Sequence, residues 1–285
     1  MGANVVVVIG VGGMGQAIAR RQGAGNKVLL ADFDEKTLAT VAELLRGQGH
    51  DVSTQVVDVS SRPSVAALAD TAAGLGPVTQ VVHTAGLSPV QASAAAVLRV
   101  DLLGTALVVE AFGRVVARGG AGLVIASMAG HMLPVPLSAE QEGALAHSPA
   151  DGLLDLPFVA PEALGQGAYV LAKYGNRLRV QAAATSWGER GARINSISPG
   201  VIATPMGLQE LDGDNGRHMR AMVSASGTGR LGTPDDIADA AAFLLGPGAT
   251  FITGNDLLVD GGVIAALRTR APAPTEPGAV PGDVR

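Results

Sequence analysis

The sequence predicts a protein of the α/β class, with a parallel sheet covered by helices. Short apolar runs alternate along the chain with segments that have the 3.6-residue period of an amphipathic helix. This alternation is typical of right-handed strand–helix–strand units, in which the strands pair in parallel. Hydrophobic residues make up 47% of the 285 residues and aromatic residues only 3%. The core must therefore consist mainly of Ala, Val, Leu and Ile, which suit strands buried on both faces.

Seven strands and six main helices are expected from these patterns. The first strand, Val5 to Ile9, is wholly apolar and leads directly into a glycine-rich loop. The other strands are expected within residues 28–31, 52–59, 78–86, 122–130, 192–200 and 255–262. Helical periodicity covers residues 16–21, 36–46, 64–73, 92–118, 168–188 and 234–245.

Two segments interrupt this alternation. Residues 131–166 contain five acidic residues and no lysine or arginine, together with short apolar pieces. We expect an inserted helical lid or subdomain there. Residues 269–285 include a proline-rich stretch without periodicity, which predicts a disordered tail. Residues 1–268 are thus expected to form a single domain.

Composition excludes several classes of function. A formal net charge of −5 leaves no basic surface for nucleic acid. The chain has no cysteine, so disulfides and thiolate nucleophiles are impossible, and its five histidines lack metal-binding spacing. No apolar run approaches the roughly 18 residues of a membrane span. The apolar start has no basic residues before it, which favours a strand over a signal peptide and predicts a cytoplasmic protein.

A dinucleotide-binding pattern follows the first strand. The stretch from Gly10 to Gly15 reads GVGGMG and fits the pattern G-x-G-x-x-G, with Gly15, directly after Met14, as the third glycine of the pattern. Glycines permit a tight turn and a close backbone approach to a pyrophosphate, while the next helix offers free N–H groups to an anion. The second strand ends at Asp32, where a carboxylate can accept hydrogen bonds from ribose hydroxyls. Because Phe33 follows and the loop lacks Lys and Arg, NAD is favoured over NADP. The alternative is a structural turn followed by an acidic helix cap.

A tyrosine and a lysine share one face of the predicted helix 168–188. The chain has only two tyrosines and three lysines, yet Lys173 follows Tyr169 by four positions. Positions i and i+4 lie on the same face of a helix, so both side chains can point toward one object. An amphipathic helix with a polar tip at each position is the alternative, and the spacing alone leaves both open.

Residues 4–268 as a whole resemble the short-chain dehydrogenase/reductase family. Besides the glycine loop, the matching pieces in chain order are DVS at 58–60, HTAG at 83–86, ASMAG at 126–130, AYVLAK at 168–173, INSISPGVIATPM at 194–206, RLGTPDDIADAAAFLL at 230–245 and ITGNDLLVDGG at 252–262. The resemblance implies a single doubly wound Rossmann domain with a seven-stranded parallel sheet, which here carries a helical insertion.

The resemblance also implies catalytic roles. Ser127 matches the serine that hydrogen-bonds the substrate oxygen, Tyr169 the general acid/base, and Lys173 the lysine that binds the nicotinamide ribose and lowers the tyrosine pKa. A free phenol has a pKa of about 10, so a nearby ammonium is needed to favour the phenolate. Together with the residues above, the implied cofactor-binding set is Gly10, Gly12, Met14, Gly15, Asp32, Phe33, Asp58, Val59, Ala85, Gly86, Tyr169, Lys173, Pro199, Gly200, Ile202 and Thr204.

The sequence departs from the family pattern at three short motifs. The glycine loop is one residue shorter than the family's, so the phosphate contacts are expected to shift. Asp101 replaces an asparagine whose backbone carbonyl helps to hold a water linking the lysine to solvent. We expect the Asp101 charge to stabilise the Lys173 ammonium but to disfavour the tyrosinate, which makes Asp101 part of the catalytic set. His83 replaces an asparagine and is expected to be a hydrogen-bonded core residue.

A larger departure separates Ser127 from Tyr169, which are 42 positions apart because of the insertion at 131–166. A bacterial 3α-hydroxysteroid dehydrogenase/carbonyl reductase subgroup has a similar insertion, and it also resembles this chain in WGERGARINSISPG and DGGVIAALR. There the insertion interferes with a dimer contact, so a homo-oligomer, either a dimer or a tetramer, is expected here with its own arrangement. The insertion and a substrate loop at 205–229 are expected to form the wall of an apolar pocket, or alternatively to pack on the core, through Met128, Met132, Leu133, Met206, Leu208, Met219 and Met222.

These observations predict an NAD-dependent oxidoreductase that interconverts a secondary alcohol and a ketone. The expected substrate is a bulky apolar small molecule such as a steroid or cyclic terpenoid. The alternative is a non-catalytic dinucleotide-sensing or regulatory protein with the same fold.

Overall fold

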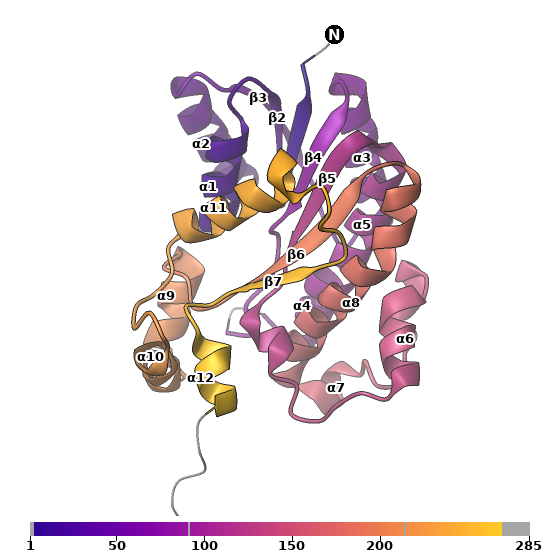
Figure 1. The fold of residues 1–285 in the computed structure, drawn as a ribbon. Coiled ribbons are helices and arrows are strands. Elements are labelled where there is room, and N and C mark those ends of the chain that lie inside the picture. The colour runs from indigo at the N-terminus through magenta and orange to yellow at the C-terminus, as the bar shows by residue number, and fades with distance from the viewer. Residues whose placement is uncertain (1–2, 91, 214, 270–285) are drawn as a thin grey trace, which may run out of the picture.

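A single parallel sheet of seven strands forms the centre of the computed structural model, which describes residues 3–90, 92–213 and 215–269 (Figure 1). The strand order is β3-β2-β1-β4-β5-β6-β7, and every pairing is parallel. The strands are β1 (Val5–Ile9), β2 (Lys27–Asp32), β3 (Asp51–Val56), β4 (Val78–His83), β5 (Val116–Ile125), β6 (Arg193–Pro199) and β7 (Asp256–Val259). The predicted fold class is therefore confirmed.

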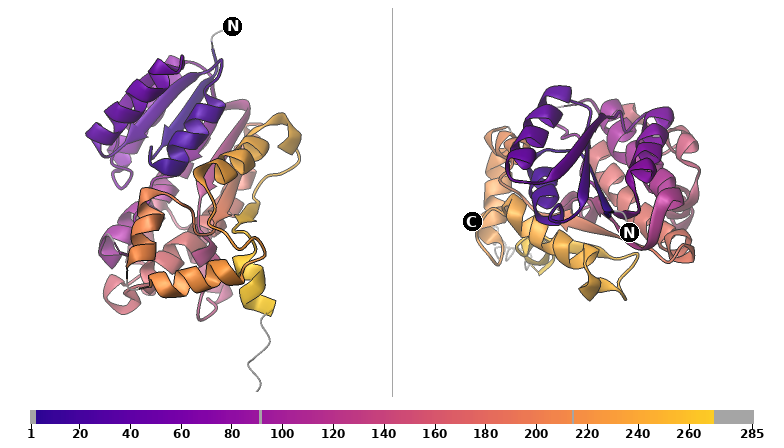
Figure 2. Two further views of the ribbon diagram at one scale, coloured as in Figure 1. Left: turned by 90° about the vertical axis from the view of Figure 1, so that its left-hand side faces the viewer. Right: turned by 90° about the horizontal axis from the view of Figure 1, so that it is seen from above.

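Helices cover both faces of the sheet (Figures 1 and 2). One face packs against α1 (Gly13–Gln22), α2 (Glu35–Gly47) and α11 (Pro234–Leu245). The other packs against α3 (Arg62–Leu75), α5 (Gly104–Val115) and α8 (Gly167–Glu189). Alternate residues of β1 point to opposite faces of the sheet. Val5, Val7 and Ile9 pack in the core beneath α3, α5 and α8, and Val6 and Val8 pack in the core beneath α1, α2 and α11. A strand buried on both sides needs apolar residues throughout, as β1 has.

The long helix expected at 92–118 is shorter and interrupted. Residues 94–115 form α4 (Ala94–Val97), one wide π-helical turn η1 (Leu98–Leu103), and then α5. The prediction was wrong at the C-terminal end, because β5 already begins at Val116, which pairs with Val78. Gly119, which has a φ of 80°, donates its N–H to the carbonyl of Gly191. This contact joins residues far apart in the chain, so the apolar pattern could not reveal it.

Local capping signals explain where several helices begin. The side chain of Asp34 accepts a hydrogen bond from the backbone N–H of Thr37 at the start of α2. At α11, Thr233 and Asp236 form a reciprocal capping box, with a proline at the first helical position. Both arrangements satisfy N–H groups that have no partner within the helix.

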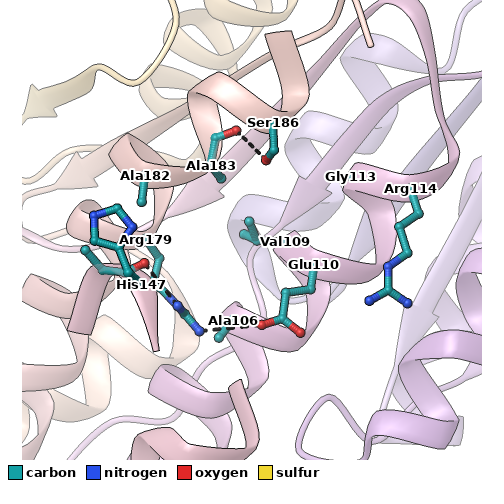
Figure 3. Close-up of a pocket in the computed structure, with 11 residues that line it drawn as sticks. Ala106, Val109, Glu110, Gly113, Arg114, His147, Arg179, Ala182, Ala183 and Ser186 are labelled. Atoms are coloured by element: carbon teal, nitrogen blue, oxygen red, sulfur yellow. Dashed lines mark hydrogen bonds and ion pairs between the residues drawn. The ribbon is translucent and has the colours of Figure 1, made fainter. Parts of the chain in front are cut away.

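The insertion 131–166 contains three short helical elements, α6 (Ala139–His147), η3 (Ala150–Asp155) and α7 (Pro161–Leu164). Arg179 of α8 donates hydrogen bonds to the carbonyls of Ala146 and Ser148, at 3.0 and 2.6 Å. It also pairs with Glu110 of α5 at 3.6 Å (Figure 3), and Glu110 accepts the N–H of Ala150. The insertion is thus held against α5 and α8 by a charged pair that hydrogen-bonds the backbone carbonyls and N–H group of the insertion.

Residues 205–229 contain two helices, α9 (Pro205–Asp212) and α10 (Gly216–Ala225), which pack with the last described helix, α12 (Val263–Thr269). The helix α12 lies at the opposite end of the molecule from the start of β1 (Figure 2). The expected disordered tail, 269–285, lies outside the described residues except for Thr269. Within the described part, every helix is too short or too polar to cross a membrane.

Replacement of Trp187 by alanine is expected to destabilise the fold strongly. Trp187 on α8 is buried, and its indole N–H donates to the carbonyl of Val109 at 3.3 Å. Its ring also fills the space beside Gly113 and Gly122, where a Cβ atom would lie 2.8 and 2.7 Å from it. Trp187→Ala should lower the free energy of unfolding by about 3–5 kcal/mol. Chemical denaturation followed by circular dichroism measures this, because the variant has no tryptophan fluorescence. Trp187→Phe should lower the free energy of unfolding distinctly less than Trp187→Ala does. Equal decreases for the two variants would contradict the packing argument.

Candidate active site

A cavity of about 670 Å³ opens at the carboxyl ends of β1, β2 and β4. The connection after β1 leads to β2 on one side, and the connection after β4 leads to β5 on the other; open α/β sheets bind their ligands at such a reversal of strand order. Eight of the predicted cofactor-binding residues line this cavity. They are Gly10, Gly12, Asp32, Phe33, Asp58, Val59, Ala85 and Gly86.

The glycine loop needs its glycines for two different reasons. Gly10 has a φ of 88°, and a Cβ there would lie 2.4 Å from the backbone nitrogen of Ala85. A Cβ on Gly15 would lie 1.9 Å from the carbonyl oxygen of Gly10, so both positions allow the backbone to pack closely. Gly12, the N-cap of α1, has no atom near its would-be Cβ and leaves the helix N-terminus open toward the cavity. Such a surface fits the pyrophosphate of a dinucleotide.

Asp32 is held in place at the end of β2. Its Oδ2 accepts the N–H of Val11 at 2.7 Å, and its Oδ1 accepts the N–H of Asp34 at 3.0 Å. These bonds aim a carboxylate at the cavity while leaving acceptor capacity for ribose hydroxyls. Asp58 accepts the N–H and hydroxyl of Ser60 on the same wall. The shortened loop and Asp32 therefore line the same cavity, which is where the sequence predicts the nucleotide.

Arg99 is a cavity residue to which no sequence motif points. It is exposed in the π-helical turn η1, and it is the one basic residue among those that line the cavity. Arg99 comes from an element far along the chain from the glycine loop. Only the folded structure brings its side chain to the wall that also contains Asp32 and Asp58.

The remaining predicted cofactor residues lie around this cavity without lining it. Met14 packs against the core between the sheet and α1. Gly200 and Ile202 line a separate cavity of about 180 Å³, and Pro199 is buried at the end of β6. Thr204 caps α9 and lies against the glycine loop, since its Cγ2 is 2.9 Å from the would-be Cβ of Gly13.

Three of the four predicted catalytic side chains come together from the end of β5 and from α8. Ser127 follows β5, and its Oγ accepts the N–H of Ala129 as the cap of the short turn η2 (Met128–His131). Tyr169 and Lys173 lie one turn apart on α8, with Nζ of Lys173 5.5 Å from the centroid of the Tyr169 ring. The hydroxyl of Ser127 is within hydrogen-bonding reach of Tyr169, so the two hydroxyls are neighbours.

Asp101 forms a buried ion pair with Lys173. Its Oδ2 lies 3.1 Å from Nζ, and both side chains are almost fully excluded from solvent. Its Oδ1 accepts the N–H of Leu87 at 2.7 Å, and its backbone carbonyl accepts the hydroxyl of Thr105 at 2.7 Å. A Cβ on Gly86 would lie 3.1 Å from Nζ and 3.2 Å from Oδ2, so glycine leaves room for the pair. The structure thus shows that the Asp101 charge lies next to Lys173, a proximity that the sequence left open.

Burial and charge act on these groups in opposite directions. Burial is the main cause of the raised pKa of Tyr169; the Lys173 ammonium opposes it, and the Asp101 carboxylate adds to it. Burial alone would lower the pKa of Lys173, but Asp101 and Tyr169 outweigh burial and raise it. Burial raises the pKa of Asp101 against the influence of Lys173. Lys173 therefore stays an ammonium, while part of its effect on Tyr169 is cancelled by its partner.

Other polar residues near the site have structural positions, as expected. His83 is buried and shares a hydrogen bond of 3.2 Å with Thr105; burial, and then Lys173, lower its pKa to about 3, so it is neutral. Ser196 and Ser198 both donate to Asp256. Tyr174 packs against the core, and its hydroxyl donates to Glu142. In the described part of the chain, no group of three or more His, Asp or Glu residues could hold a metal ion.

Comparison with known proteins agrees with this geometry. Residues 4–139 match the family described as short chain dehydrogenase, and residues 160–264 match that described as enoyl-(acyl carrier protein) reductase. The chain is 41% identical over 270 residues to the short-chain dehydrogenase/reductase bsc3 of Alternaria brassicicola, covering 94% of this chain and 98% of that protein. It is 30% identical over 269 residues to D-threitol dehydrogenase of Mycolicibacterium smegmatis, covering 91% and 92%.

The expected subgroup is a more distant relative. The 3-alpha-hydroxysteroid dehydrogenase/carbonyl reductase of Comamonas testosteroni is 28% identical over 278 residues, covering 93% of this chain and 98% of that protein. Among solved structures, an actinorhodin polyketide ketoreductase with NADPH superposes with a TM-score of 0.72 at 23% identity, covering 92% of this chain and 99% of the other, which shows the shared fold. The chain belongs to the short-chain dehydrogenase/reductase family of oxidoreductases, which act on alcohols and ketones with NAD(H) or NADP(H).

Proposed function

We propose that this protein interconverts a secondary alcohol and a ketone with NAD as its cofactor. The observation that carries the proposal is the grouping of Ser127, Tyr169 and Lys173 beside a nucleotide-sized cavity with Asp32 on its wall. When bound, the cofactor supplies or accepts the hydride of the reaction. Everything else that the reaction requires is proton transfer and orientation of the substrate oxygen.

Tyr169 is the proposed general acid/base. In the oxidation direction, its phenolate takes the proton from the substrate hydroxyl; in reduction, its phenol returns a proton to the ketone oxygen. The hydroxyl of Ser127 can hydrogen-bond the same oxygen without changing its own charge. Lys173, kept protonated by Asp101, stabilises the phenolate electrostatically. Because burial and Asp101 both raise the pKa of Tyr169, oxidation is expected to be favoured by alkaline conditions.

Asp32 supports the choice of NAD over NADP. A 2′-phosphate on the adenine ribose would come close to a carboxylate that Val11 and Asp34 hold toward the cavity. Repulsion between like charges in a partly buried site would weaken NADPH binding. Arg99 is exposed and lines the same cavity as Asp32, in the part where we propose that the adenine and its ribose bind.

A bulky apolar substrate, such as a steroid or cyclic terpenoid, remains our proposal for the substrate class. Met206 lines the cavity, and Met132 and Leu208 are exposed, so these three are available to a substrate. Met128 and Met222 are instead buried in the cluster between α9, α10 and α12, and Met219 packs against it. The name of the hydroxysteroid dehydrogenase relative is consistent with this class. We also propose a homo-oligomer, a dimer or tetramer, in which the insertion modifies contacts made by α5 and α8.

Replacement of Tyr169 by phenylalanine should abolish turnover without abolishing cofactor binding. Loss of a general acid/base is expected to lower kcat by about 100- to 10,000-fold. Tyr174→Phe is the matched control, because it changes the only other tyrosine, whose hydroxyl contacts Glu142 instead. Steady-state kinetics and titration of NADH fluorescence measure the two effects. If Tyr169→Phe keeps full activity, or if the wild type binds NADH but oxidises no alcohol, a non-catalytic dinucleotide-sensing role gains support.

Asp32 should determine the preference between the two cofactors. Titration of the wild type is expected to show tighter binding of NADH than of NADPH. Asp32→Asn removes the repelling charge and should narrow that difference by about tenfold, which corresponds to about 1.4 kcal/mol. Glu35→Gln, a nearby change at the exposed start of α2, should leave the preference unchanged. A wild-type preference for NADPH would overturn the cofactor assignment but not the reaction class.

Asp101 should shift the pH dependence of oxidation toward alkaline values. Its negative charge raises the pKa of Tyr169, so Asp101→Asn should lower that pKa and move the rise of the pH–rate profile to lower pH. Profiles of kcat against pH for the two proteins test this directly. Identical profiles would show that the Asp101 charge does not reach the reaction centre.

A further inference from the structure

Helix α9 places a carboxylate beside the catalytic residues. Met206 lines the cavity, and Glu210 lies four positions after it on the same face of α9. Its Oε1 accepts a hydrogen bond from the hydroxyl of Ser88, in the loop after β4. The two residues are 122 positions apart in the chain and meet only in the folded protein.

The Ser88 loop is the same segment that contacts the Lys173–Asp101 pair. Leu87 donates its N–H to Asp101, and a Cβ on Gly86 would lie 3.1 Å from Nζ of Lys173. Ser88 is buried, and its Oγ also accepts the N–H of Val90 at 3.2 Å. Glu210 is therefore hydrogen-bonded to a buried hydroxyl. That hydroxyl belongs to Ser88, which follows directly after Gly86 and Leu87, the two residues that lie against the ion pair.

Glu210 has no cation to neutralise it. Among residues 3–90, 92–213 and 215–269, Ser88 is its hydrogen-bond partner, and none of the ion pairs includes it. The Glu210 charge also raises the pKa of Tyr169, which opposes formation of the phenolate. A carboxylate accepts hydrogen bonds and cannot donate them, so Oε2 can bind only a donor group. A wholly apolar substrate would remove water from this carboxylate without replacing its hydrogen bonds, which is unfavourable.

We infer that Glu210 recognises a second hydrogen-bond donor on the substrate, a hydroxyl or amino group close to the alcohol carbon that reacts. The inference rests on the proposed alcohol dehydrogenase activity and narrows its substrate class. The substrate is then a diol or an amino alcohol on an otherwise apolar skeleton. Such a group replaces the water that the carboxylate loses when the site closes, and it positions the reacting carbon relative to Tyr169 and Ser127.

Three cyclic alcohols of equal ring size test this inference on the full-length protein with NAD. Cyclohexanol lacks the second donor, 1,2-cyclohexanediol has a hydroxyl, and 2-aminocyclohexanol has an amino group. We expect the wild type to bind and oxidise at least one of the two donor-bearing compounds about 10- to 100-fold better than cyclohexanol. That is the range for a hydrogen bond to a charged group. The compound with the larger advantage identifies the donor.

Variants of Glu210 and Ser88 distinguish recognition of the substrate by Glu210 from a purely structural contact between α9 and the Ser88 loop. Glu210→Ala should remove most of the advantage of the donor-bearing compound over cyclohexanol and should shift the pH–rate profile to lower pH. Ser88→Ala keeps the carboxylate and should keep the advantage, and so should Asp212→Asn, which removes an exposed charge from the same helix. If Glu210→Ala lowers activity on all three alcohols equally, Glu210 only fastens α9 to the Ser88 loop, and the inference is wrong.

The test also distinguishes this inference from the proposed function. Binding of each alcohol to the protein–NAD complex is measured by calorimetry, independently of turnover. Tyr169-dependent oxidation without a Glu210-dependent preference overturns the inference alone. A Glu210-dependent binding preference without any Tyr169-dependent oxidation supports recognition by Glu210 and overturns the proposed reaction. Equal binding of all three alcohols by the wild type also overturns the inference.

Discussion

The buried ion pair between Lys173 and Asp101 is the interaction on which the arrangement of the site depends. It joins α8 to the π-helical turn η1, and the second oxygen of Asp101 extends the connection to the backbone of Leu87. Two charges removed from water are stable only when they are paired and hydrogen-bonded, so these three segments are held in one arrangement. Gly86 is required beside the pair because a side chain there would crowd both charged groups.

This pairing also sets the electrostatic state of the catalytic tyrosine. Tyr169 lies close to one ammonium and two carboxylates, those of Asp101 and Glu210, whose charges raise its pKa while Lys173 lowers it. The cation that activates the phenol is therefore partly neutralised by its own partner. A cofactor bound beside Tyr169 would contribute a positive nicotinamide ring in the oxidised form and would shift the balance toward the phenolate. The charge of an oxidised cofactor would therefore add to that of Lys173 in favouring the phenolate.

The insertion packs against the outer helices α5 and α8, and none of its residues is among those that line the cavity of about 670 Å³. Glu110 of α5 and Arg179 of α8 face each other (Figure 3) and hold the insertion through hydrogen bonds to its backbone. Tyr174, one position after Lys173, adds a contact from α8 to Glu142. The same helix therefore presents Tyr169 and Lys173 to the reaction on one side and supports the insertion on another, so the two regions are mechanically connected.

Sequence patterns were enough to predict the fold class, the order of strands and helices, and most residues of the candidate site. Periodicity and glycine spacing are local properties, and the positions of Gly10, Asp32, Ser127, Tyr169 and Lys173 follow from them and from family resemblance. Only the tertiary structure revealed where the long fourth helix ends, that Asp101 pairs with Lys173 at 3.1 Å, and that Arg99 and Glu210 reach the site. Those features depend on contacts between residues far apart in the chain. No local pattern records such contacts, because the free energy that stabilises them comes from burial and pairing in the folded protein.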